Sequence, residues 1–155
     1  MYEAIRTKSV HTMADLPDDF PHRSREEELD LQLAGHLAAL LAVTDELRAL
    51  GSGTSGTDIG EAAGADLDAA AERLAREVAR LRGGTPPTRS TVSDATNLAD
   101  LHQRAHVLAG RALVVAASRA DTGAAILAAE RVDAHAAAHA QAPVADSARE
   151  LTGAH

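Results

Sequence analysis

Residues 29–50 read LDLQLAGHLAALLAVTDELRAL, and this stretch decides the fold. Its apolar side chains recur at alternating intervals of four and three residues, the spacing of a seam along one face of an α-helix. The seam is sustained over three heptads and includes one histidine: Leu29, Leu33, His36, Leu40, Val43, Leu47 and Leu50. The stretch therefore predicts an amphipathic helix that buries this face against other helices.

Local signals predict where this helix and the next begin and end. Ser24 and Glu27 form a capping-box pattern at the start of SREEELDL, followed by acidic residues that suit the positive end of a helix dipole. A glycine-, serine- and threonine-rich linker occupies 51–60. We expect the first helix to run from this cap to about residue 50, and a second helix over 61–82 that the GGTPPT motif ends.

Two further helices are predicted after this motif. Ser93 or Asp94 is a suitable cap for a third helix that continues to about Arg119. The ADTG turn then supplies Asp121 as the cap of a fourth helix, which we expect to end near residue 141, ahead of Pro143.

Each of these helices also carries a seam at the four-and-three spacing. The seams are Leu67, Ala71, Leu74, Val78 and Leu81 in the second helix, Leu98, Leu101, Ala105, Leu108, Ala112 and Val115 in the third, and Ala125, Ala128, Val132, His135, His139 and Ala142 in the fourth. Four such helices predict an all-α, antiparallel four-helix bundle with alanine- and leucine-rich seams. We expect the bundle domain over 24–141, between a flexible N-terminal segment, 1–23, and a flexible C-terminal tail, 142–155. Up-down-up-down winding is favoured, although the longer linkers on either side of the second helix leave other windings open.

Composition excludes several classes of function. The net charge of −8 opposes binding to a phosphate backbone, so we expect no nucleic-acid partner. The chain has no cysteine, which removes thiolate catalysis, cysteine-based zinc sites and disulfides. No apolar run approaches the ~18 residues of a membrane span, and the first twenty residues lack the apolar core of a secretory signal. The sequence therefore predicts a soluble, cytoplasmic protein with no membrane partner.

Histidines supply the one chemical pattern that points to a ligand. The stretches HQRAH and HAAAH each place two imidazoles one helical turn apart, a spacing that can chelate one metal ion. In an up-down-up-down bundle these histidines fall at similar heights, with one more on the first helix and a glutamate on the second. The candidate ligands for Zn, Cu, Ni or Co are His36, His102, His106, His135 and His139, with Glu77 as a carboxylate.

The same histidines have a plainer interpretation, as core or solvent-facing residues that bind no metal. They do not match the Glu and Glu-x-x-His pattern of di-iron bundles, and no motif fixes a catalytic nucleophile.

We therefore expect a non-enzymatic interaction protein, such as a regulatory, adaptor or accessory subunit, that binds a protein partner or forms a homo-oligomer. The expected contact surface combines the nearly all-alanine faces of the fourth helix with Val107 and Val114, which lie on the side of the third helix away from its seam. The alternatives are a histidine-coordinated bundle for metal storage, sensing or transfer, and a small-molecule-binding bundle with a cavity between alanine-rich helices.

Overall fold

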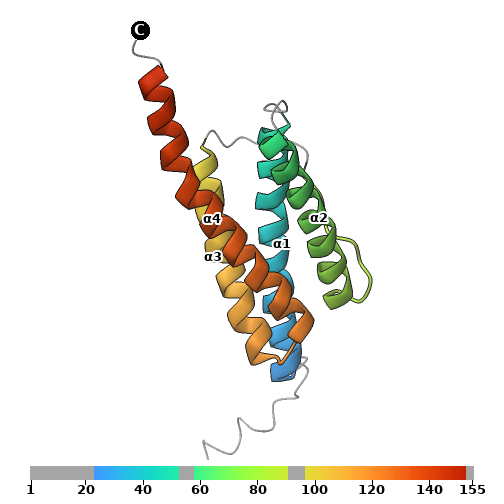
Figure 1. Ribbon diagram of the computed structural model, residues 1–155. Helices are drawn as coiled ribbons and strands as arrows, with labels where there is room; N and C mark the ends of the chain where they lie inside the picture. Colours follow the sequence, from blue (N-terminus) through green and yellow to red (C-terminus); the bar gives the residue numbers. More distant parts are fainter. Residues whose placement is uncertain (1–22, 53–57, 91–96, 153–155) are drawn as a thin grey trace, which may run out of the picture.

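The computed structural model describes residues 23–52, 58–90 and 97–152, with side chains to residue 141. Four α-helices make up this part of the chain: α1 (Arg25–Gly51), α2 (Asp58–Leu81), α3 (Leu98–Ser118) and α4 (Thr122–Thr152). α3 packs against α4 and α1, and α2 packs mainly against α1 (Figure 1). The prediction of an all-α four-helix bundle is confirmed, and within the described ranges there is no strand.

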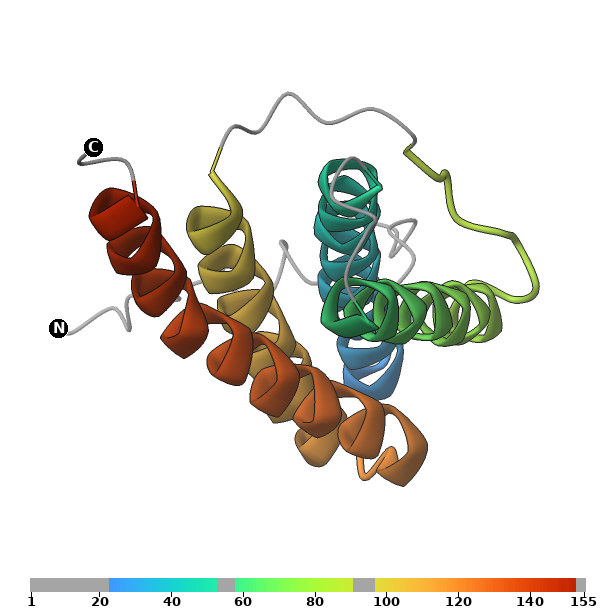
Figure 2. The same cartoon turned by 45° about the horizontal axis from the view of Figure 1, so that its top comes forward.

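The helices wind up-down-down-up, so the favoured up-down-up-down winding is wrong. Arg119, just past the end of α3, donates from Nε to Asp30 near the start of α1 over 3.0 Å. α3 therefore runs antiparallel to α1, as Figure 2 also shows, and in the same overall direction as α2 (Figure 1). The physical reason is the length of the connection 82–97, which extended would reach ~50 Å. That exceeds the ~36 Å of α2, so the chain can return to the opposite end of the bundle before α3 begins.

A buried carboxylate holds the described part of this connection against α1. Asp45, 2% exposed, accepts hydrogen bonds from Arg89 at both oxygens, over 2.9 and 3.0 Å, and one from the backbone N–H of Ser90 over 3.2 Å. Burial acts to raise the pKa of Asp45, but the hydrogen bonds from Arg89 and Ser90 outweigh it and leave the pKa below its usual value. No spacing in the sequence identifies this pair, because the two residues lie on different segments.

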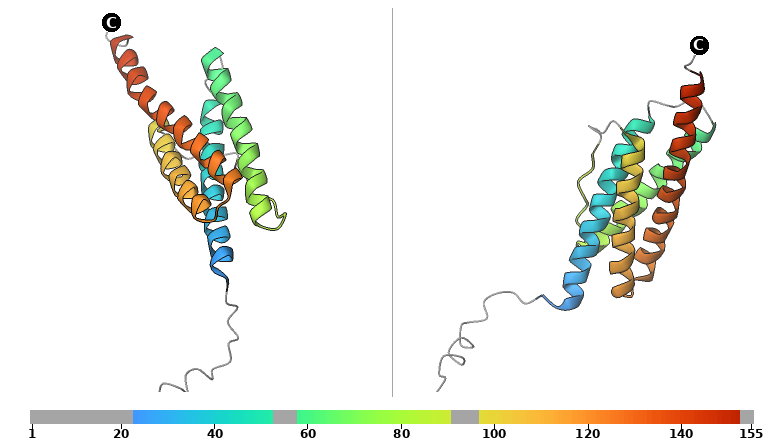
Figure 3. Two further views of the ribbon diagram at one scale, coloured as in Figure 1. Left: turned by 60° about the horizontal axis from the view of Figure 1, so that its bottom comes forward. Right: turned by 90° about the vertical axis from the view of Figure 1, so that its left-hand side faces the viewer.

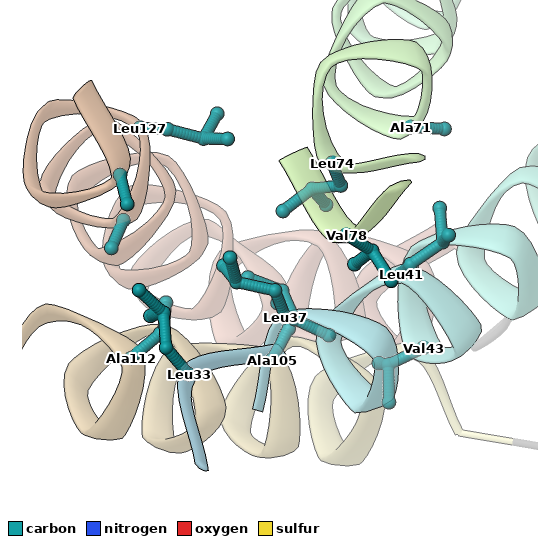
Figure 4. Packing of buried hydrophobic residues seen from close by; sticks show 14 of the residues in the cluster. Leu33, Leu37, Leu41, Val43, Ala71, Leu74, Val78, Ala105, Ala112 and Leu127 are labelled. Carbon is teal, nitrogen blue, oxygen red and sulfur yellow. The ribbon is translucent and has the colours of Figure 1, made fainter. Parts of the chain in front are cut away.

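The core is built from leucines on α1 and alanines on α3 and α4. α3 presents four alanines of 0% exposure, Ala105, Ala109, Ala112 and Ala116, and α4 adds Ala124 and Ala128 at the same exposure. Such small side chains favour the short end of the 8–10 Å range of interaxial distances, and α3 with α4 forms the most extensive helix pair. Figure 4 shows the leucines of α1 between this pair and the apolar side chains of α2.

α2 packs mainly on α1 and touches α4 over a much smaller area. Figure 3 shows the two helices diverging. Three ion pairs join them: Arg73 binds Glu130, Arg80 binds Asp121, and Arg131 binds Asp66. The α2–α4 side of the bundle is therefore its polar side.

The predicted caps are partly confirmed. Ser24 and Glu27 form the capping box of α1, and Asp121 accepts from the N–H of Ala124 at the start of α4. α3 is capped by Asn97, whose side chain accepts from the N–H groups of Ala99 and Asp100. The caps expected at residues 93 and 94, and the flexible segment expected over residues 1–22, lie outside the described residues.

α4 does not end near residue 141. It continues through Pro143 to Thr152, in place of the non-helical tail that the proline favoured. Proline removes one backbone donor, but the residues after it in ADSARELT include good helix formers that support continuation. Beyond the start of α3 this part of α4 projects from the bundle (Figure 1).

We expect Asp45→Asn to lower the free energy of unfolding by ~1.5–3 kcal/mol, the usual worth of a hydrogen bond to a charged group. Asp68→Asn is the matched control, because that carboxylate is 63% exposed and pairs with Arg48 at the surface; it should cost less than ~1 kcal/mol. Urea denaturation measures both. Equal losses from the two variants would contradict the anchoring role of Asp45.

The tight turn between α3 and α4 yields a second stability prediction. Ala120 has a φ of 56°, a left-handed backbone conformation that is unfavourable for any residue with a Cβ atom. The turn after α2 has a glycine, Gly83, in the same conformation, with a φ of 68°. Ala120→Gly should therefore raise the free energy of unfolding by ~0.5–1 kcal/mol, and Gly83→Ala should lower it by ~1 kcal/mol or more. Thermal unfolding of both variants checks this; a destabilised Ala120→Gly variant would show that another contact fixes the turn.

Candidate functional site

Four of the predicted histidines meet between α3 and α4. Because the two helices are antiparallel, His102 faces His135 directly, while His106 lies level with Val132 and His139 level with Ala99. The four histidines lie at the end of the α3–α4 contact that is nearer the start of α3. The buried alanines occupy the rest of this contact. We call these four side chains the histidine cluster.

His102 and His135 form its centre. Their Nδ1 atoms are 3.1 Å apart, and the ring centroids are 5.4 Å apart with an interplanar angle of 43°. A neutral imidazole donates from one nitrogen and accepts at the other, so one Nδ1 carries the shared proton and the other accepts it. His135 is 1% exposed, and its Nε2 has no hydrogen-bond partner among the described residues. This ring is thus buried with one nitrogen satisfied and one not.

The environment keeps both rings uncharged at neutral pH. Burial lowers the pKa of His135 to about 4, and the charges of His102 and Arg131 act in the same direction. The pKa of His102 is lowered by burial and then by the charge of His139. Uncharged rings are the form that can share a proton or coordinate a metal ion.

His106 and His139 are both oriented by backbone carbonyls. The Nδ1 atom of His106 lies 3.1 Å from the carbonyl of Val132, and that of His139 lies 3.4 Å from the carbonyl of Ala99. A carbonyl oxygen only accepts, so Nδ1 carries the proton in both rings and Nε2 keeps its lone pair. His106 is half-buried, whereas His139 is exposed.

The other two predicted ligands lie elsewhere. His36 lines a hollow between α1 and α3 with Val107 and Val114, and Glu77 accepts from Arg80 near the end of α2. His36 and Glu77 were expected level with the other histidines because the up-down-up-down winding starts α1 and α3 at the same end of the bundle. In the observed winding α3 starts at the opposite end. Within the described part of the chain no three histidine or acidic side chains are already placed to hold a metal ion, so metal binding remains a prediction.

Sequence reasoning missed Arg131, the other buried polar residue of this helix face. It lies one turn before His135, is 6% exposed, and donates to both oxygens of Asp66 over 3.0 and 3.3 Å. Its Nε, like Nε2 of His135, has no partner among the described residues. The signal that could have found it is the four-residue spacing from His135.

No family model, curated protein or solved structure matches this chain. Of the described helices, none has the length and apolar character that crossing a membrane requires. Functional roles therefore rest on the chemistry of the residues themselves.

In the metal-free protein we expect stability to fall as pH falls from ~6.5 toward 4. The unfolded chain protonates His135 near its ordinary pKa of ~6.5, while the folded chain resists protonation until about pH 4. Between these values the unfolded state binds more protons, which lowers the free energy of unfolding by up to ~3 kcal/mol. Above pH ~6.5 both states are neutral and the effect vanishes.

Urea denaturation with a chelator present, at half-unit intervals over this range, measures the effect. His135→Leu should flatten the profile, because a buried side chain that cannot ionise replaces the imidazole. His139→Gln, at an exposed position of the same helix, should keep most of the slope. Parallel profiles for wild type and His135→Leu would contradict this assignment.

Proposed function

We propose that this chain is a non-enzymatic interaction protein that self-associates through the outward side of α1 and α3. Two hollows on this side, of about 410 and 420 Å³, share Val107 and Arg111 and so lie next to each other; together they are called the groove. We call the groove and its rim the α1/α3 face. It is lined by His36, Ala39, Ala42, Val43, Glu46, Gln103, Arg104, Val107, Leu108, Gly110, Arg111, Val114 and Val115.

The observation that carries the proposal is the exposure of valines here. Val107 is 40% and Val114 66% exposed, whereas the alanines on the opposite side of α3 are 0% exposed. Together with Gly110 these valines repeat at intervals of three and four, the spacing of a second seam that points outward. No described helix covers that seam. α1 and α4, the two neighbours of α3 within the chain, leave this outward seam open, so a further neighbour comes from another chain.

The charges on the face favour a second copy of the chain as the occupant. Arg104 and Arg111 from α3 and Glu46 from α1 lie at the groove, and none of them has an ion pair within the described residues. A two-fold axis running along the helices brings Glu46 of one copy beside Arg104 of the other, and the reverse contact follows by symmetry. Opposite charges at the rim then set the register.

The size of the face also suits a dimer. α3 has 21 residues and is ~31 Å long, and two helices side by side are ~20 Å wide with their side chains. The resulting area of ~620 Å² is at the lower end of the ~600–1,000 Å² per partner of a standard protein–protein interface.

The small-molecule alternative finds less support. Both hollows open on the surface between helices, and exposed or half-buried residues line most of them. The buried leucines and alanines of the seams close the interior instead. A surface groove of this shape suits a helix better than an enclosed ligand.

Wild-type protein should be a dimer by light scattering at tens of micromolar, and Val114→Glu should shift it to monomer because a carboxylate enters the apolar seam. Ile126→Glu is the matched control, since Ile126 is 53% exposed on α4, away from the α1/α3 face. That variant should remain dimeric. A wild type that is monomeric under these conditions, or dimers of equal strength in both variants, would contradict the proposal.

Charge exchange tests the register. Glu46→Arg and Arg104→Glu should each weaken the dimer ~5–10-fold by placing like charges at the rim, and the double variant should recover most of the loss. Sedimentation equilibrium measures the three dissociation constants.

A further inference from the structure

We infer that His102, His135 and His139 form a binding site for one divalent transition-metal ion, of which zinc is the representative. This inference goes beyond self-association, because the histidine cluster lies between α3 and α4 and not on the α1/α3 face. Three observations support it: the spacing between the Nδ1 atoms of His102 and His135, the exposed ring of His139, and the buried Nε2 of His135, which has no hydrogen-bond partner among the described residues.

The spacing of the central pair already suits coordination. Two imidazole nitrogens that each lie ~2.0–2.1 Å from a tetrahedral zinc ion are ~3.3 Å apart. The Nδ1 atoms of His102 and His135 are 3.1 Å apart. In the metal-free chain a single proton lies between them. When an ion takes its place, the ring that carried the proton holds it on Nε2 instead, and both rings turn so that their Nδ1 lone pairs meet at the ion while the nitrogen spacing changes little.

His139 is the third ring. It follows His135 by four residues on α4, the spacing with which helices present two histidines to one zinc ion. Its side chain is exposed and held only by a 3.4 Å hydrogen bond to the carbonyl of Ala99. The carbonyl of Ala99 that holds it lies three residues before His102 on α3, so the two rings lie along the same stretch of that helix. Rotation of this exposed ring completes a set of three that the metal-free chain does not hold in place.

His135 provides the independent observation. Nε2 of this nearly inaccessible ring has no hydrogen-bond partner among the described residues, so no contact there opposes the tautomer that carries its proton on Nε2 and leaves Nδ1 for the ion. Metal ligands usually donate from their second nitrogen to a carboxylate or a carbonyl. The charge of Asp66 acts on His135, but both of its oxygens accept from Arg131, so its support of the ring is electrostatic.

The ligand set defines the class of metal. Three neutral imidazoles suit zinc, copper, nickel and cobalt, whereas magnesium and calcium require oxygen ligands. Three protein ligands leave a fourth position for water. The inference is therefore a three-histidine site with one open position.

The test uses the full-length chain without an affinity tag, stripped with a chelator and titrated with Zn²⁺ at pH 7.5 by calorimetry. We expect one ion per chain and a rise in melting temperature with Zn²⁺ concentration. Co²⁺ should give the absorption bands of four-coordinate nitrogen and oxygen ligation. His102→Gln and His139→Gln should each weaken binding by more than the ~10–100-fold that loss of a supporting second partner costs.

The controls separate this site from others on the chain. His106→Gln and His36→Gln should keep wild-type affinity, and Val114→Glu should bind Zn²⁺ while monomeric, which separates metal binding from self-association. His139 is exposed, so its substitution leaves folding intact. Lack of saturable binding in the wild type, or undiminished binding in His139→Gln, would overturn the inference. So would an equal loss of affinity in His36→Gln.

Discussion

The close approach of α3 and α4 is the constraint on which the rest of the structure depends. Alanines of 0% exposure occupy both sides of this contact, and small side chains allow two helix backbones to come close together. Where the alanines end, the same approach brings His102 and His135 within 3.1 Å. The histidine cluster is thus a product of helix packing and needs no specialised loop.

The two sides of α3 have different chemistry as a result. The side toward α4 is closed by alanines and histidines, and the opposite side exposes Val107 and Val114. Because alanines bury little apolar area each, this chain gains less from its core than a leucine-rich bundle of equal length. Self-association through the α1/α3 face buries further apolar area, and this links the proposed function to the composition of the core.

Sequence reasoning predicted most of the elements and little of their arrangement. Heptad spacing and the capping box are local signals, so α1 and the class of the fold were predictable from residues such as Ser24, Glu27 and Leu40. The winding was not, because a connection as long as 82–97 permits either direction for α3, and the contact that anchors it joins Asp45 to Arg89, 44 residues apart in the chain. The same error placed His36 with the histidine cluster. The pairs at four-residue spacing on α3 and α4 were located correctly, since their spacing alone fixes a shared face.

The contact between His102 and His135 is the central claim, and proton–nitrogen correlation spectra of the imidazole rings test it most directly. In metal-free protein labelled with nitrogen-15, we expect both rings to be neutral at pH 7, one with its proton on Nδ1 and the other with a bare Nδ1 that accepts it. His135 should stay neutral until about pH 4. Two rings of the same tautomer that both titrate near pH 6.5, as exposed imidazoles do, would contradict the contact and the packing that produces it.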